Sequence, residues 1–136
     1  MVSDRNEMKV VFRGNKKVDA EFNGFTVKTD QPKDGGGEDS APGPFDFFLA
    51  SIGTCAGVFI QSFCEKRKIP TEGIELTEKI EWDESKHLVR KVILELHLPK
   101  DFPEKYRESV LAAANLCTVK RHLQEPPQID IRTHDL

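Results

Sequence analysis

One long stretch of helical periodicity limits the folds open to this sequence more than any other feature. Between Pro44 and Pro70, apolar side chains recur three or four positions apart over about five turns. Proline suits the first turn of a helix, and the second proline would end any helix that reached it. The stripe consists of Phe45, Phe48, Leu49, Ile52, Ala56, Phe59, Ile60 and Phe63. Four phenylalanines are too many for a helix packed on one side only. We therefore predict a central helix that is covered by a sheet or by a second subunit.

Alternating apolar and polar residues predict strands on both sides of this helix. Asn23-Gly24 lies between two such segments and predicts a hairpin with a type I′ turn, because that turn needs positive φ at both central residues. A second helix is expected from about residue 104. The predicted strands are 8–13, 17–22, 25–29, 74–82, 88–98 and 128–133. The order βββ-α-ββ-α-β indicates an α+β fold with an antiparallel sheet, in a single domain over residues 1–136.

The segment 30–43 is rich in glycine, proline and acids and has no large apolar residue, so it predicts a flexible surface loop. A phosphate cradle is the alternative for the run Gly35-Gly36-Gly37. The acids Glu38-Asp39 follow directly and would repel phosphate, and no Gly-Lys-Ser/Thr motif is present. A plain linker or a mobile flap is the better interpretation.

Charge and composition exclude several classes of protein. The net charge is −3 and the sequence pI is near 5.8, whereas a nucleic-acid-binding domain typically has a basic patch and a pI above about 9. No apolar run approaches the roughly 18 residues of a membrane span. The N-terminus is polar and carries acids, unlike a signal peptide. We therefore expect a cytoplasmic protein without nucleic-acid or membrane partners.

Three cysteines are the residues most open to a chemical interpretation. A free cysteine in a reducing compartment is either reactive or a small buried hydrophobe. Cys55 and Cys117 fall on apolar helix faces, and Cys64 falls on the flank opposite the stripe. Cys55 and Cys64 would be roughly 13 Å apart along one helix, beyond the ~7 Å limit for a disulfide. The better redox pair is therefore Cys55 with Cys117, with Cys64 as the spare thiol.

A reactive Cys55 needs help to become a thiolate, because burial raises a thiol pKa. It is expected about three turns into its helix, too far for the helix dipole to act. The sequence therefore predicts that a nearby cation is required, and the candidates are Arg13, Lys120 and Arg121. Asp46 could orient that cation, or it could simply interact with the positive end of the helix dipole.

The histidines do not suggest a metal centre. Cys117 and His122 form a C-x4-H pair without a second half, and no two histidines have the spacing of zinc ligands. We expect neither a metal nor a bound cofactor.

Two segments resemble the OsmC/Ohr family of osmotically inducible and organic hydroperoxide resistance proteins. The first opens the predicted central helix and carries Cys55, and the second carries Cys117. Their residues are Ala41-Pro42-Gly43-Pro44, Asp46, Leu49-Ala50-Ser51, Gly53-Thr54-Cys55-Ala56 and Ala112-Ala113-Ala114-Asn115-Leu116-Cys117-Thr118-Val119. The family's hydroperoxide reductases carry glutamate directly after the loop proline. Here Phe45 stands in that place and the acid follows one residue later, so the sequence is closer to a divergent OsmC-like branch.

This resemblance implies an intertwined homodimer with thiol-dependent peroxidase activity on organic hydroperoxides. It also implies a role in oxidative stress. Cys55 would attack the peroxide and Cys117 would resolve the resulting sulfenic acid to a disulfide. An external thiol or dithiol would regenerate the pair. Arg13, near the end of the first strand, matches the family's arginine by position, and Asp46 would support it.

Two other functions remain open on the sequence. A protein of this fold could bind an apolar ligand or sense redox state without significant turnover. A plain α+β domain with three buried thiols is the third interpretation.

Overall fold

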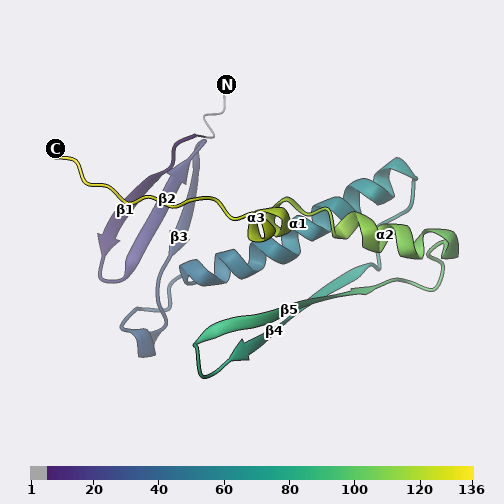
Figure 1. The fold of residues 1–136 in the computed structure, drawn as a ribbon, viewed down its shortest axis with the longest axis horizontal. Coiled ribbons are helices and arrows are strands. Elements are labelled where there is room, and N and C mark those ends of the chain that lie inside the picture. Colours follow the sequence, from purple (N-terminus) through teal and green to yellow (C-terminus); the bar gives the residue numbers. More distant parts are fainter. Residues whose placement is uncertain (1–5) are drawn as a thin grey trace. The chain divides into compact units, whose positions relative to one another are not determined.

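The computed structural model describes residues 6–136, whose helices and strands are shown in Figure 1. The long helix α1, Pro44–Lys66, confirms the helix predicted between Pro44 and Pro70, and its covering by a sheet or a second subunit stays a prediction. The contacts of the chain form two compact units, and the single domain also stays a prediction. One unit ends at Ala50 and the other begins at Ser51, inside α1. Each unit is described by itself.

The N-terminal unit contains a three-stranded antiparallel sheet with the order β1-β2-β3. Its strands are β1 (Lys9–Gly14), β2 (Lys17–Phe22) and β3 (Phe25–Thr29), close to the predicted bounds. Between β2 and β3, Asn23 has φ 50° and Gly24 has φ 78°. Both values are positive, which confirms the predicted type I′ geometry.

The loop between β3 and α1 is organised around the buried carboxylate of Asp30. The hydroxyl of Ser40 and the backbone N–H groups of Gln31, Glu38 and Ser40 donate hydrogen bonds to it. The Ser40 hydroxyl is the main cause that holds the pKa of Asp30 at about 2. Gly37 is required here, because a Cβ at this position would overlap the carbonyl oxygen of Gln31. The segment predicted as flexible is therefore folded around one carboxylate, and its mobility stays a prediction.

In the C-terminal unit, an antiparallel hairpin follows the remainder of α1. It is formed by β4 (Glu75–Asp83) and β5 (Leu88–His97). The elements after the hairpin are the 3₁₀ turns and helices η2 (Glu104–Tyr106), α2 (Arg107–Ala114) and α3 (Thr118–Gln124).

One apolar cluster holds the C-terminal unit together. It joins α1 to α2 and to the residues after β5, and Leu76 and Leu96 of the hairpin pack against it. Its buried members are Ile60, Phe63, Cys64, Phe102 and Val110. Val110 is fully buried, which stabilises the fold by about 1.5–3 kcal/mol relative to an exposed side chain.

The last part of the chain differs from the prediction in two ways. The second predicted helix is broken, so Cys117 does not lie on a helix face but directly before α3. Residues 128–133 form no strand among the described residues, and Ile129 and Ile131 are 82% and 93% exposed. The alternation at 128–133 is suited to a strand, but a strand also needs the backbone of a neighbouring strand.

Candidate active site

α1 places Cys55 at the edge of the core. The helix buries Ile52 and Ala56, the residues one turn before and directly after Cys55, while Cys55 itself is only partly buried. The side chain is thus shielded on one side and open on the other. This is the environment of a reactive thiol, because a fully enclosed thiol is inert.

Cys117 occupies the N-cap position of α3. Its backbone is extended (φ −50°, ψ 130°), and its carbonyl oxygen accepts the N–H of Arg121 as the first hydrogen bond of the helix. The first N–H groups of a helix have no partner within the helix. In α3 these donors belong to Thr118, Val119 and Lys120, and they face the two thiols.

Four donors converge on the sulfur of Cys55. Burial raises its pKa, but hydrogen bonds from the backbone N–H of Val119, the thiol of Cys117, and the N–H and hydroxyl of Thr118 outweigh burial. The resulting pKa of Cys55 lies below the ordinary thiol value of 9.0. Hydrogen bonds to the charged form favour that form, so Cys55 ionises more readily than an ordinary thiol.

Cys117 is shifted in the opposite direction. Burial is the largest cause that raises its pKa, and the neighbouring Cys55 raises it further, while the backbone N–H groups of Lys120 and Val119 oppose the shift. Cys117 is 2% exposed. The pKa values of the two thiols are therefore shifted in opposite directions, and a hydrogen bond from Cys117 to Cys55 joins them.

The groups that lower the pKa of Cys55 are uncharged donors at the start of α3. The dipole of α1 was expected to be too distant to act, but a second helix, α3, begins beside the thiol. That a cation also acts on Cys55 stays a prediction. Of the candidate cations, Lys120 contributes its backbone N–H to Cys117, while its ammonium donates to Asn115 Oδ1 at 2.6 Å. Arg121 contributes the N–H that begins the helix.

Arg13 and Asp46 lie in the N-terminal unit, and their roles beside the thiols stay predictions. The guanidinium of Arg13 forms ion pairs with Asp19 at 3.2 Å and with Glu21 at 3.3 Å. The carboxylate of Asp46 accepts the N–H of Gly43 at 2.9 Å, which fixes the entry into α1.

Cys64 is separate from the reactive pair. It is fully buried in the core cluster, although the sequence places it on the flank opposite the apolar stripe. The reason is that α2 and the residues after β5 cover that flank as well. Burial raises the pKa of Cys64, with Arg67 acting weakly against it. These surroundings favour an inert thiol.

An apolar groove of about 470 Å³ lies one turn beyond Cys55 along α1. Its apolar lining includes Phe59, Phe63, Ala113 and Leu116, and Lys66 and Arg67 line it as well. Phe59 is four residues after Cys55 and Leu116 directly precedes Cys117, but neither cysteine lines the groove. The groove can hold an apolar group of a small molecule.

A metal centre and a membrane span are two other possibilities for residues 6–136. No group of three or more His, Cys, Asp and Glu side chains there could hold a metal ion. By length and composition alone, α1 is long and apolar enough to cross a membrane. The core helix of a soluble protein can meet the same criteria.

Comparisons with known proteins agree with the fold. A protein from Psychrobacter arcticus 273-4, described by its name as related to osmotic stress and detoxification, shares 19% identity and a TM-score of 0.73 over 88% of this chain and 89% of its own. An organic hydroperoxide resistance protein OsmC from Legionella pneumophila shares 18% identity and a TM-score of 0.58 over 89% and 91%. The organic hydroperoxide resistance protein OhrB of Bacillus subtilis shares 19% identity and a TM-score of 0.52 over 88% and 92%.

At these identities the solved structures establish the fold alone. No curated protein sequence matches the chain. The family model of OsmC-like proteins matches residues 36–132, a range that includes both cysteines of the pair. This chain therefore belongs to the OsmC-like protein family.

Proposed function

We propose that this protein is a thiol-dependent peroxidase that reduces organic hydroperoxides through Cys55 and Cys117. The observation that carries the proposal is the hydrogen-bonded pair, in which the pKa of Cys55 is lowered and that of Cys117 is raised. A peroxidase needs one thiolate to attack and one thiol held in reserve. The names of the Legionella and Bacillus relatives agree with this reaction class.

In the proposed reaction, the Cys55 thiolate attacks the terminal oxygen of the hydroperoxide. The O–O bond breaks, Cys55 becomes a sulfenic acid, and the alkoxide leaves as an alcohol after it takes the proton of Cys117. The Cys117 thiolate then attacks the sulfenic sulfur, an S–S bond forms, and hydroxide leaves as water after protonation. An external thiol or dithiol is oxidised as it reduces this disulfide. No metal or bound cofactor takes part in this scheme.

The apolar groove supports an organic rather than an inorganic peroxide as substrate. Its wall, formed by Phe59, Phe63 and Leu116, would bury the alkyl or aryl group of the substrate beside Cys55. Hydrogen peroxide has no apolar group, so it would gain nothing from the groove. We therefore expect a preference for organic hydroperoxides.

We further propose that the working form is a homodimer in the cytoplasm. Only 22% of the apolar window of α1 is buried within one chain. The side chains of Phe45, Phe48 and Val58 on this helix are 47%, 38% and 62% exposed. A second copy that covers α1 would bury them, and it could also offer a strand to residues 128–133. Sedimentation that shows a folded monomer at micromolar concentration would contradict the dimer.

The apolar groove also favours a second candidate function, the binding of an apolar ligand without turnover. The two functions differ in their need for Cys55. Ligand binding in the groove survives Cys55→Ser, whereas peroxidase turnover does not.

Consumption of cumene hydroperoxide in the presence of dithiothreitol tests the main proposal. We expect turnover by the wild type, its loss in Cys55→Ser, and its retention in the matched control Cys64→Ser. Thiol counting after one equivalent of peroxide should show the loss of two thiols, with Cys64 still free. No consumption by the wild type, or equal consumption by Cys55→Ser, refutes the enzyme.

A further inference from the structure

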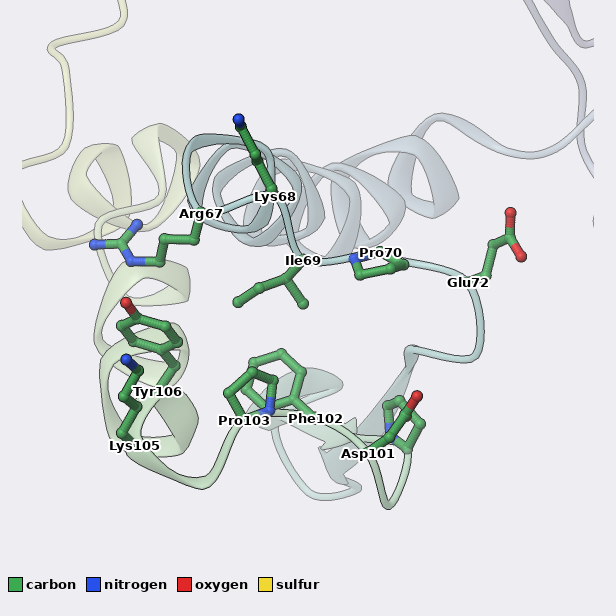
Figure 2. Close-up of a pocket in the computed structure, with 11 residues that line it drawn as sticks. Arg67, Lys68, Ile69, Pro70, Glu72, Asp101, Phe102, Pro103, Lys105 and Tyr106 are labelled. Atoms are coloured by element: carbon green, nitrogen blue, oxygen red, sulfur yellow. The ribbon is translucent and has the colours of Figure 1, made fainter.

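A second cavity, of about 390 Å³, lies beyond the last turn of α1 and shares Arg67 with the apolar groove (Figure 2). It opens between the residues that follow α1 and the segment that leads from β5 into α2. Its apolar side chains include Ile69, Phe102 and Pro103, and Phe102 is only 4% exposed. Neither cysteine of the reactive pair lines it. Its volume is at the lower end of the range of about 300–1,000 Å³ for small-molecule sites.

Arg67 lines this cavity, and its guanidinium packs against two aromatic rings. Its guanidinium carbon is 3.6 Å from the ring centroid of Phe63 and 5.3 Å from that of Tyr106. One guanidinium N–H donates to the carbonyl oxygen of Phe63 at 3.0 Å. Among the described residues, no carboxylate forms an ion pair with it. Since a guanidinium has five N–H donors, several remain for a ligand.

A second cation and a hydroxyl group lie close to Arg67. The ammonium of Lys105 is 5.1 Å from the centroid of the same Tyr106 ring. Figure 2 shows the guanidinium of Arg67, the hydroxyl of Tyr106 and the ammonium of Lys105 on one side of the cavity. Glu72 and Asp101 lie on the opposite side in this view. Arg67 and Lys105 thus lie on one side of the cavity and the two acids on the other, and Lys68 also belongs to the lining.

We propose that this cavity binds a small apolar monocarboxylate. The carboxylate would accept hydrogen bonds from Arg67, Lys105 and the Tyr106 hydroxyl, and the apolar body would cover Ile69 and Phe102. A preoriented guanidinium loses little freedom when it binds, and its planar donors match a carboxylate. Glu72 and Asp101 at the far end disfavour a second negative charge on the ligand. The site goes beyond the peroxidase reaction, and it shares Arg67 with the groove proposed for the substrate.

An NMR titration of the ¹⁵N-labelled full chain tests this site, with hexanoate as the probe and 1-hexanol as the uncharged match. Hexanoate at about 10 mM should shift the signals of the Arg67 side chain, Phe102 and Tyr106, as expected for a millimolar ligand. Hexanol should bind at least about tenfold more weakly, because it lacks the charge that strengthens the hydrogen bonds of a carboxylate.

Two variants and two controls complete the test. Arg67→Met and Lys105→Met should each weaken hexanoate binding about tenfold or more. Lys86→Met, in the turn between β4 and β5, should leave binding unchanged, as should Cys55→Ser. If Arg67→Met disturbs the stack on Phe63, Lys105→Met still decides the outcome. Absence of shifts, equal binding of hexanol, or unchanged binding by Lys105→Met would overturn the proposal. Because Cys55→Ser separates the two sites, a failed peroxidase assay leaves this result intact.

Discussion

Two glycines inside α1 should respond in opposite ways to the same substitution. A Cβ at Gly57 would meet no heavy atom within 4 Å, whereas a Cβ at Gly53 would come within 3.0 Å of Oε1 of Glu78. Glu78 extends from β4 toward α1 and accepts a hydrogen bond from the Gly53 backbone. Its other oxygen is buried without a hydrogen-bond partner among the described residues. Because Gly53 has no Cβ, the carboxyl group of Glu78 can approach the backbone of α1 at this position.

The expected magnitudes follow from these contacts. Replacing a helix-interior glycine by alanine stabilises a helix by about 0.8–1 kcal/mol, so Gly57→Ala should raise the free energy of unfolding by about that amount. Gly53→Ala gains the same helix stabilisation, but its Cβ displaces the partly buried Glu78 carboxyl group from its hydrogen bond with the Gly53 backbone. That displacement costs about 1–3 kcal/mol. Gly53→Ala should therefore be less stable than Gly57→Ala by about 1–3 kcal/mol.

Urea unfolding at one fixed chain concentration measures this difference, since self-association would change the apparent stability. A double-mutant cycle supplies the control: in the background Glu78→Ala, the two glycine substitutions should have equal effects. Equal stabilisation by Gly53→Ala and Gly57→Ala in the wild-type background would refute the reasoning. A difference that persists after Glu78→Ala would show that another contact is responsible.

Four further outcomes are expected. Cys117→Ala removes a hydrogen-bond donor from Cys55, so the pKa of Cys55 should rise in a titration of thiolate absorbance, and peroxide should leave a sulfenic acid that dimedone traps. The ionised form of Asp30 stabilises the loop above its unfolded pKa near 3.8, and this contribution should be lost as the pH falls from about 4 to about 2. Hydrogen exchange of the loop measures this loss, which Asp30→Asn should not show. Gly24→Ala should destabilise the protein by about 1 kcal/mol in urea unfolding, because φ is +78° at this position. Cys64 should react with iodoacetamide only after denaturation, as read by mass spectrometry, because it is fully buried.

Local patterns predicted most of the secondary structure correctly. The helical period and Pro44 located α1, and alternation with Asn23-Gly24 located the first hairpin. These features depend on near neighbours in the chain, and so they are readable without the fold. The break between α2 and α3 was missed because no proline or glycine marks it.

The strand expected at 128–133 failed for a different reason. Alternation determines which residues could face one side of a sheet, but it does not provide the neighbouring strand. The described chain offers residues 128–133 no such neighbour, and Ile129 and Ile131 remain exposed. In the same way, the apolar pattern of α1 does not identify what covers this helix, and the proposed second copy of the chain would cover it.

For the thiols, the sequence by itself determined that Cys55 and Cys64 cannot pair, because the rise of one helix separates them. It also identified Cys117 as the better partner. Only the tertiary structure decided which thiol ionises more readily, since the pKa depends on donors that α3 brings to Cys55 from more than sixty residues away in the chain. Spacing along a helix is a property of the chain, whereas the electrostatic environment of a sulfur atom is a property of everything that packs around it.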